Sequence, residues 1–285
     1  MRILLAQLAP VPGDVGKNVE RLARVLRAAP SDLAVFPELF LSGYRVGDRL
    51  HRLALRDGDP TVRSLREIAE GAHTTIVVGA PFASTERAGE VHNAAVAVTS
   101  TGELRIQVKR FLPTFGPFEE GVPFTPTDTS VPARLAGASV GLEVCYDAFF
   151  PEVSRDLALA GAELLVVLSA APITSRPLFE RLLPARAIEN AVPVVYVNRV
   201  GVEDGVVFGG GSGAWDARGE PYVLNALSVA GAEPEETVLT LEVDVREAAR
   251  WRPFRPVLRD VARRPGTSSV PSSLSESGAT PTRPL

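Results

Sequence analysis

Apolar runs and amphipathic stretches alternate along the first eighty residues of the chain. Three short apolar runs, each typical of a buried strand, cover residues 3–8, 32–36 and 74–78. Apolar side chains at three- and four-residue spacing over residues 15–26 predict a helix between the first two runs. A second helix is expected over residues 59–71, because Asp59 is a good N-cap and Pro60 suits the first helical turn. Such alternation is typical of a layered α/β sandwich.

The remainder of the chain repeats this plan. Two alternating runs at residues 94–99 and 103–108 flank a Ser-Thr-Gly segment and predict a hairpin. Strands are then expected at residues 139–144, 164–168 and 194–197, helices at 151–160 and 185–190, and a second hairpin at 212–220. We expect the later helix to begin at Pro184, because an interior proline removes a helical hydrogen bond. Two such halves would place two sheets face to face with helices outside.

The domain boundary follows from a change in composition near the C-terminus. Residues 1–262 read as a single domain without an internal linker, and residues 263–285 are rich in Ser, Thr, Pro and Gly. Because that segment has almost nothing to bury, it is predicted to be a disordered tail.

Composition and charge exclude several classes of partner. The 30 basic and 34 acidic residues leave a formal charge of −4, and the arginines form no basic stripe, which argues against nucleic acid and anionic membranes. A single cysteine forms no intrachain disulfide, the N-terminus reads as a strand instead of a signal peptide, and no apolar run approaches about 18 residues. These features predict a cytoplasmic protein. The 45% of hydrophobic residues is ample for a sizeable core.

The one cysteine, Cys145, stands where the apolar strand at residues 139–144 ends. A thiol at that point can face a pocket and act as a nucleophile. The alternative is structural, because free cysteine is among the most buried residue types and packs as a small hydrophobe.

Two other strand ends carry ionisable side chains in apolar surroundings. Glu38 follows the strand at residues 32–36, where exclusion of water would favour the uncharged form and suit it to accept a proton. Lys109 follows the strand at residues 103–108. Each has a plain alternative, Glu38 as a cap and Lys109 as a solvated hairpin residue. Because strand ends converge on one edge of an α/β fold, the three side chains can meet in one crevice.

These three residue types together suit one reaction. Attack of a thiolate on an amide or nitrile carbon needs a base for the thiol, a positive donor for the oxyanion and an acid for the leaving amine. Glu38 can serve as base and acid, and Lys109 as donor. A neighbouring lysine is also expected to lower the pKa of the Cys145 thiol from its free value of about 8.5.

The segments that carry these residues resemble the signatures of the nitrilase superfamily of carbon-nitrogen hydrolases. The matching segments are Val-Phe-Pro-Glu-Leu at 35–39, Lys-Arg-Phe-Leu-Pro at 109–113 with Phe-Glu-Glu at 118–120, Gly-Leu-Glu-Val-Cys-Tyr-Asp at 141–147 with Phe-Pro-Glu at 150–152, Ala-Arg-Ala-Ile-Glu-Asn at 185–190 and Asn-Arg-Val-Gly at 198–201. They occur in the family's order and together cover roughly residues 1–250.

The resemblance implies a four-layer α-β-β-α sandwich that forms a homodimer or larger homo-oligomer. It implies Glu38 as base, Lys109 as oxyanion stabiliser, Cys145 as nucleophile and Glu120 as a second glutamate that orients the lysine and the substrate. The backbone N–H of Tyr146 would be the other oxyanion donor. No cofactor and no metal is expected, because the three histidines show no ligand spacing.

Within the superfamily, several segments resemble the glutaminase domain of glutamine-dependent NAD synthetase, among them the Leu-Ser-Gly-Tyr segment that ends at Tyr44. Two departures remove hydroxyl groups from the expected pocket. Phe115 replaces a tyrosine, and the Ser-Ala-Ala-Pro segment around Ala170 replaces a serine-containing loop. A pocket without those partners favours a less polar substrate. Arg176, near the same loop, binds a substrate carboxylate or is simply solvated.

The leading hypothesis is a hydrolase that cleaves a small amide or N-carbamoyl compound through a cysteine thioester. A nitrilase and a free-standing glutamine amidohydrolase that supplies ammonia are the alternatives within the same chemistry. A papain-like peptidase fits poorly, because none of the histidines lies at a strand-end motif with Cys145. A non-catalytic binding or scaffold protein of the same fold is the alternative from another class.

Overall fold

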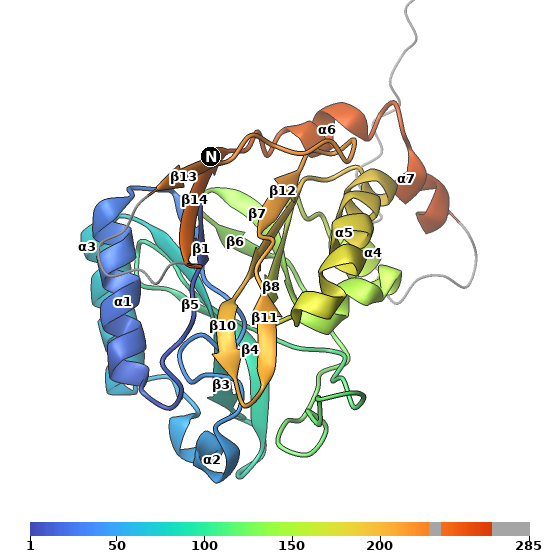
Figure 1. Cartoon of the computed structure of the whole chain (residues 1–285). Helices are drawn as coiled ribbons and strands as arrows, with labels where there is room; N and C mark the ends of the chain where they lie inside the picture. The colour runs from blue at the N-terminus through green and yellow to red at the C-terminus, as the bar shows by residue number, and fades with distance from the viewer. Residues whose placement is uncertain (228–234, 264–285) are drawn as a thin grey trace, which may run out of the picture.

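A computed structural model describes residues 1–227 and 235–263 of the chain. Two β-sheets lie face to face, and helices cover the outer face of each, so that the molecule has four layers (Figure 1). The predicted α-β-β-α sandwich is confirmed. None of the helices within the described ranges is long and apolar enough to cross a membrane.

The first sheet has seven strands in the described part of the chain, in the spatial order β13-β14-β1-β2-β3-β4-β5. Their bounds are β1 Arg2–Gln7, β2 Leu33–Val35, β3 Thr75–Ala83, β4 Val91–Val98, β5 Leu104–Val108, β13 Asn225–Leu227 and β14 Thr237–Glu242. Strands β1, β2 and β3 are parallel, and each of the other pairings is antiparallel. Strand β5 therefore runs in the same direction as β2 and β3.

The second sheet has the order β12-β9-β8-β7-β6, and a separate two-stranded ribbon, β10-β11, follows β9 in the chain. The bounds are β6 Ala133–Leu135, β7 Ala138–Val144, β8 Leu164–Ser169, β9 Val194–Asn198, β10 Val200–Glu203, β11 Val206–Gly209 and β12 Gly213–Trp215. Strands β7, β8 and β9 are parallel and form the centre of this sheet.

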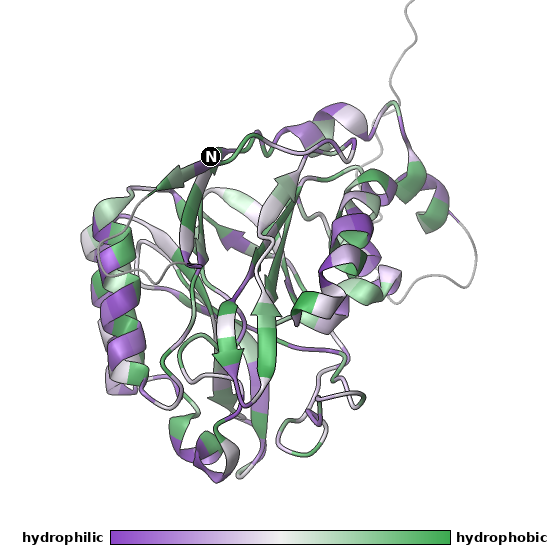
Figure 2. Ribbon diagram, in the orientation of Figure 1, coloured by the Kyte–Doolittle hydropathy of each residue, from purple (hydrophilic) through white to green (hydrophobic). Residues whose placement is uncertain are grey.

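The outer layers are amphipathic helices. On the first sheet lie α1 (Val15–Ala28) and α3 (Pro60–Ala72), and on the second lie α4 (Pro151–Leu159) and α5 (Arg176–Asn190) (Figure 1). Figure 2 shows polar and apolar residues alternating around α1, whose buried side includes Leu22, Val25 and Leu26. The described part of the chain has three further short α-helices: α2 (Leu50–Leu53), α6 (Glu247–Trp251) and α7 (Val257–Ala262).

The central core lies between the two sheets. Ile3 and Leu5 of β1 face Val144 and other residues of the second sheet, whereas Leu4 points to the layer under α1 and α3. Because both faces of the central strands are buried, these strands read as continuous apolar runs in place of an alternating pattern.

The strand ends that carry the predicted site residues meet at one edge of the sandwich. Glu38 lies just beyond β2, Lys109 directly after β5 and Cys145 directly after β7. All three strands run toward this edge, which is why residues distant in sequence come together there.

One detail of the predicted organisation is wrong, and one hairpin was not predicted. Pro184 lies inside α5, which begins at Arg176, because Phe179, Leu183 and Ala187 anchor the helix on the second sheet on both sides of the proline.

The expected hairpin at 212–220 is present but short. After β12, the chain turns and pairs back antiparallel through the bridge from Trp215 to Pro221, with the N–H of Asp216 bonded to the carbonyl oxygen of Glu220 at 2.8 Å. The unpredicted hairpin is β10-β11. The predicted tail falls, from residue 264 onward, outside the described residues.

Candidate active site

Glu38 is held in the crevice by a backbone turn that only a glycine beneath it permits. The loop after β2 crosses β3 at Gly79, whose N–H donates to the carbonyl oxygen of Pro37 at 3.0 Å. A Cβ atom at position 79 would overlap the backbone of residues 37–39. The Glu38 side chain is fully buried, and its Oε2 accepts the backbone N–H of Ala170, at the end of β8, at 2.8 Å. Glu38 therefore bonds across the two sheets and does not cap its own segment.

Lys109 is fully buried between two carboxylates. Its Nζ lies 2.6 Å from Oε1 of Glu38 and 2.8 Å from Oε1 of Glu120. Both glutamates are themselves buried, so the three charges share a space from which water is largely excluded. The alternative of a solvated hairpin lysine is excluded by this burial.

Tyr44 and Asn93 complete the surroundings of the ion pair. The Tyr44 hydroxyl donates to Oε1 of Glu120. The side-chain amide of Asn93, on β4, donates to Oε1 of Glu38 at 2.7 Å and to Oε2 of Glu120 at 3.3 Å. The two glutamates are thus bridged twice, once by a lysine and once by an asparagine.

These charges stabilise one another against the cost of burial. Burial lowers the pKa of Lys109, but the carboxylates of Glu120 and Glu38 outweigh it and hold that pKa above its ordinary value. Burial raises the pKa of Glu120, and the ammonium group of Lys109 opposes the shift. Lys109 is consequently a permanent cation, with two of its three N–H groups directed at carboxylates in the described structure.

Cys145 adopts a backbone conformation that is rare for a residue with a side chain. Its φ angle is 49°, in the left-handed region, at the junction of β7 and a 3-10 turn over Cys145–Phe149. Asp147 holds this turn in place: its Oδ2 accepts the N–H of Val144 at 3.1 Å, and its Oδ1 accepts the N–H groups of Arg110 and Phe111 at 3.0 and 2.9 Å. One carboxylate therefore fixes the cysteine turn to the segment that follows Lys109.

Cys145 is half-buried, and its thiol lies within hydrogen-bond distance of Ser169, whose hydroxyl donates to Sγ at 3.2 Å. Burial and the Glu38 carboxylate raise the pKa of the thiol well above its ordinary value, and Lys109 only partly opposes them. Lys109 acts on the pKa of the thiol in the expected direction, but the net shift is upward, so the expected rise in the thiolate fraction is wrong. The sulfur rests as a neutral thiol, and its activation requires transfer of the proton to a base.

Aromatic rings gather next to Cys145. Tyr146 makes an edge contact with Phe115, with ring centroids 5.2 Å apart, and another with Phe150 at 5.0 Å. Phe150 stacks on Phe111 at 3.6 Å. Phe115 is 55% exposed, so the aromatic cluster that includes Tyr146 presents an apolar surface to solvent.

The other predicted substrate-binding residues have mixed positions. Tyr44 and the backbone of Ala170 contact the two glutamates, as described above. Arg176 begins α5 and forms an exposed ion pair with Glu180 at 2.9 Å, and no described hydrogen bond joins it to the buried cluster. The substrate-binding roles of Tyr44, Phe115, Tyr146, Ala170 and Arg176 stay predictions.

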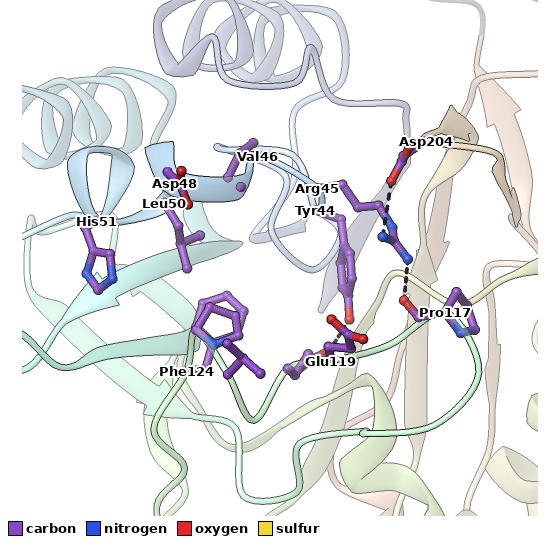
Figure 3. A pocket seen from close by; sticks show the side chains of 14 residues that line it. Tyr44, Arg45, Val46, Asp48, Leu50, His51, Pro117, Glu119, Phe124 and Asp204 are labelled. Carbon is purple, nitrogen blue, oxygen red and sulfur yellow. Dashed lines mark hydrogen bonds and ion pairs between the residues drawn. The ribbon is translucent and has the colours of Figure 1, made fainter.

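A cavity of about 490 Å³ adjoins this cluster. Tyr44 and Glu120 belong to its wall, whereas Cys145, Lys109 and Glu38 do not line it. Figure 3 shows Arg45 at one end of the cavity, bridging Asp204 and the carbonyl oxygen of Pro117, with His51 and Leu50 at the other end. The cavity therefore lies next to the buried charged cluster, with which it shares Tyr44 and Glu120.

Three residues of the site were assigned no role from the sequence. Asn93 is a lone amide in an apolar strand, which is a signal that a buried polar partner exists nearby. Ser169 and Asp147 stand within matched or neighbouring segments, at strand ends where side chains can reach the crevice. Their contacts depend on which strands become neighbours, and only the fold specifies that.

Comparison with known proteins shows one consistent relationship. The carbon-nitrogen hydrolase family model matches residues 2–253. The chain is 35% identical to an (R)-stereoselective amidase from Pseudomonas sp over 254 residues, 88% of each protein. It is 34% identical over 258 residues to the glutamine-dependent NAD(+) synthetase of Thermotoga maritima, of which the match covers 43%. The predicted similarity to NAD synthetase is thus confined to one part of that larger protein.

Solved structures give the same picture. A carbon-nitrogen hydrolase from Helicobacter pylori G27 superposes with a TM-score of 0.79 and 25% identity, covering 91% of this chain and 94% of that one. A mutant of an amidase from Nesterenkonia sp. AN1 superposes with a TM-score of 0.73 and 29% identity, covering 90% of this chain and 98% of that one. Its structure shows the Michael addition of acrylamide at the active-site cysteine.

Proposed function

Because the chain belongs to the carbon-nitrogen hydrolase family, we propose that it cleaves the C–N bond of a small carboxamide or N-carbamoyl compound through a thioester on Cys145. The observation that carries this proposal is the placement of a neutral thiol beside a buried Glu38–Lys109–Glu120 cluster. That cluster combines a carboxylate that can accept a proton with a cation that remains charged.

In the first half of the reaction, Glu38 accepts the thiol proton as the Cys145 sulfur bonds to the carbonyl carbon. The carbonyl π electrons move to oxygen, and the remaining N–H of Lys109 and the backbone N–H of Tyr146 stabilise the oxyanion. When the oxyanion collapses, the C–N bond breaks and Glu38 returns the proton to the departing nitrogen. Ammonia or an amine leaves, and the acyl group stays on sulfur.

Water completes the cycle. Glu38 removes a proton from a water molecule, whose oxygen attacks the thioester carbon. Collapse of the second oxyanion breaks the C–S bond, and the thiolate takes the proton back from Glu38. The product is a carboxylic acid, or a carbamic acid that decomposes, and the enzyme is regenerated.

The aromatic surface beside the thiol supports an apolar acyl group. Tyr146 follows Cys145 directly in the chain and contacts the exposed ring of Phe115, which supports an apolar acyl group on Sγ. A zwitterionic amide such as glutamine would have to desolvate its charges against these rings. In the related Nesterenkonia amidase mutant, the small amide acrylamide adds to the active-site cysteine, so a small uncharged amide reaches the thiol of that relative.

The decisive experiment combines ammonia detection with intact-mass spectrometry on a panel of aliphatic amides, N-carbamoyl compounds, nitriles and glutamine. We expect ammonia from the aliphatic amides and an acyl adduct of the corresponding mass, both abolished in Cys145→Ala with the fold retained. An adduct formed best by nitriles or glutamine would identify those alternatives. A panel without any adduct or ammonia would leave the scaffold hypothesis and overturn the proposal.

We also propose a homodimer or larger homo-oligomer as the working assembly, which family membership supports. Light scattering coupled to size-exclusion chromatography measures it directly, and a monomer at micromolar concentration would contradict it.

A further inference from the structure

We infer that Asn93 is a positioning residue that directs the proton of the Cys145 thiol to Oε2 of Glu38. The inference rests on the proposed function, which makes Glu38 the base. It concerns a residue outside the predicted quartet of Glu38, Lys109, Glu120 and Cys145, and it assigns different tasks to the two oxygens of one carboxylate.

The two carboxylate oxygens of Glu38 accept different numbers of hydrogen bonds from the described residues. Each carboxylate oxygen offers two lone pairs. Oε1 accepts Lys109 Nζ at 2.6 Å and Asn93 Nδ2 at 2.7 Å, which occupies both. Oε2 accepts one described donor, the N–H of Ala170 at 2.8 Å, and therefore keeps one lone pair for a proton. Without Asn93, Oε1 would also have a free lone pair, and the thiol proton could bind to either oxygen of Glu38.

The side-chain amide of Asn93 bonds to both carboxylates, although this orientation leaves its own carbonyl oxygen without a hydrogen bond among the described residues. Its side chain is fully buried, and both amide hydrogens point at carboxylates, one at Glu38 and one at Glu120. Its Oδ1 is buried without a hydrogen-bond partner among the described residues. An unpaired buried acceptor destabilises the folded state, but turning the amide over would place Oδ1 against two anionic groups. The amide orientation is therefore imposed by the carboxylates.

The same residue also positions the lysine through its backbone. The N–H of Lys109 donates to the carbonyl oxygen of Asn93 at 2.9 Å, which extends the β4-β5 pairing by one residue. Asn93 thus contacts all three charged members of the cluster, with its side chain on the glutamates and its main chain on the lysine.

Several ionisable groups face this arrangement from the surrounding elements. Tyr44 bonds to Glu120, and the Cys145 thiol interacts electrostatically with Glu38, Lys109 and Glu120. The buried Tyr196 and Arg199 interact with Glu38, and Asp147 interacts with Lys109. A change at Asn93 acts on these groups through Glu38 and Glu120. It should therefore be visible in how the reactivity of Cys145 depends on pH.

The test measures the rate at which iodoacetamide alkylates Cys145 between pH 5 and 9. The sulfur displaces iodide, forming an S–C bond as the C–I bond breaks, and the thiol proton passes to Glu38. Cys145 is the only cysteine, so intact mass reports one site, and no natural substrate is needed. The variants are Asn93→Leu, which keeps the shape and removes both donors, and Asn93→Asp, which places a third carboxylate in the cluster.

We expect alkylation at pH 7 to slow about tenfold in Asn93→Leu. The acid limb of its pH profile, where the rate falls as the pH decreases, should move up by about one pH unit, because the charged carboxylates lose a donor. In Asn93→Asp the limb should move up by about two units, because a like charge is added. Thermal unfolding of each variant checks that it is folded. If Asn93→Leu does not fold, Asn93→Asp carries the test.

The matched control is Asn190→Leu. Asn190 is another fully buried asparagine whose Oδ1 has no described partner, and its amide donates only to the carbonyl oxygen of Arg186 in α5. Its substitution should lower the free energy of unfolding and leave the acid limb in place. A wild-type pH profile in both Asn93 variants, or an equal shift in Asn190→Leu, would overturn the inference. Since alkylation needs no amide turnover, a failed amide panel is a separate result that bears on the proposed function.

Discussion

The backbone N–H of Ala170 donates to Oε2 of Glu38 across 2.8 Å, although 132 residues separate the two in the chain. Glu38 follows a strand of the first sheet and Ala170 follows a strand of the second. This bond therefore fixes the distance between the two sheets at the point where the predicted base and nucleophile meet. A shift of one sheet against the other would lengthen or break this bond and so displace Glu38.

Lys109→Met should lower both the free energy of unfolding and the rate of acylation. The substitution leaves Glu38 and Glu120 buried without their cation, which costs about 3–5 kcal/mol in the free energy of unfolding. Loss of the oxyanion donor should lower the acylation rate by at least about 10²-fold. Urea denaturation and single-turnover mass spectrometry measure the two effects.

Lys17→Met is the control for that variant, because Lys17 is 65% exposed and pairs with Asp14 on the surface. It should change stability by less than about 0.5 kcal/mol. The deficit of Lys109→Met should shrink as the pH falls and the unpaired carboxylates become protonated. Unaltered acylation by Lys109→Met would remove the lysine from the oxyanion role.

Gly79→Ala tests the loop that presents Glu38. The added methyl group would overlap the backbone of Pro37, Glu38 and Leu39, so the loop must lift from β3. We expect a loss of about 1–3 kcal/mol in stability and about 10²-fold in kcat/KM, because a displacement of about 1 Å misplaces the base.

Gly71→Ala provides the comparison, since Gly71 lies in α3 with nothing within 4 Å of an added Cβ. This variant should gain up to about 1 kcal/mol from helix propensity and keep full activity. Equal behaviour of the two alanine variants would show that the close approach at Gly79 does not position Glu38.

Glu143→Gln should change the pH dependence of stability. Burial raises the pKa of Glu143 to about 7, and the Ser154 hydroxyl, which donates to Oε1 at 2.7 Å, only partly opposes the shift. The folded protein thus holds a proton that the unfolded chain releases near pH 4.5. Stability from this group is present below that pH and is lost as the pH rises toward 7.

The uncharged glutamine should remove this loss, which is on the order of 3 kcal/mol between pH 5 and 8. Denaturation at several pH values compares the variant with the wild type and with Glu67→Gln, an exposed substitution on α3. Parallel stability curves for wild type and Glu143→Gln would contradict the prediction.

Phe115→Tyr tests substrate polarity. Phe115 is 55% exposed, so a hydroxyl there should alter stability by less than about 0.5 kcal/mol. We expect the ratio of kcat/KM for glutamine to that for butyramide to rise several-fold, because the new hydroxyl can bond a polar substrate. Phe254→Tyr, at a position 79% exposed on the C-terminal segment, should leave the ratio unchanged. If the ratio stays constant in both variants, Phe115 does not determine the preference between polar and apolar substrates.

The sequence by itself determined the sandwich and the residues that end its strands. Continuous apolar runs predicted β2, β7, β8 and β9, because strands buried on both faces carry few polar side chains. Glu38, Lys109 and Cys145 stood out because each interrupts an apolar context at a strand end. Local patterns of this kind are readable because burial acts on each segment separately.

Only the tertiary structure decided the contacts among these residues. Asn93, Ser169 and Asp147 acquire their partners from other strands, and the neutral state of the Cys145 thiol results from burial and Glu38 outweighing Lys109. Pro184 likewise lies inside α5 because packing on the second sheet outweighs one missing hydrogen bond. Each outcome depends on through-space distances between segments far apart in the chain, and hydrophobic periodicity carries no information about those distances.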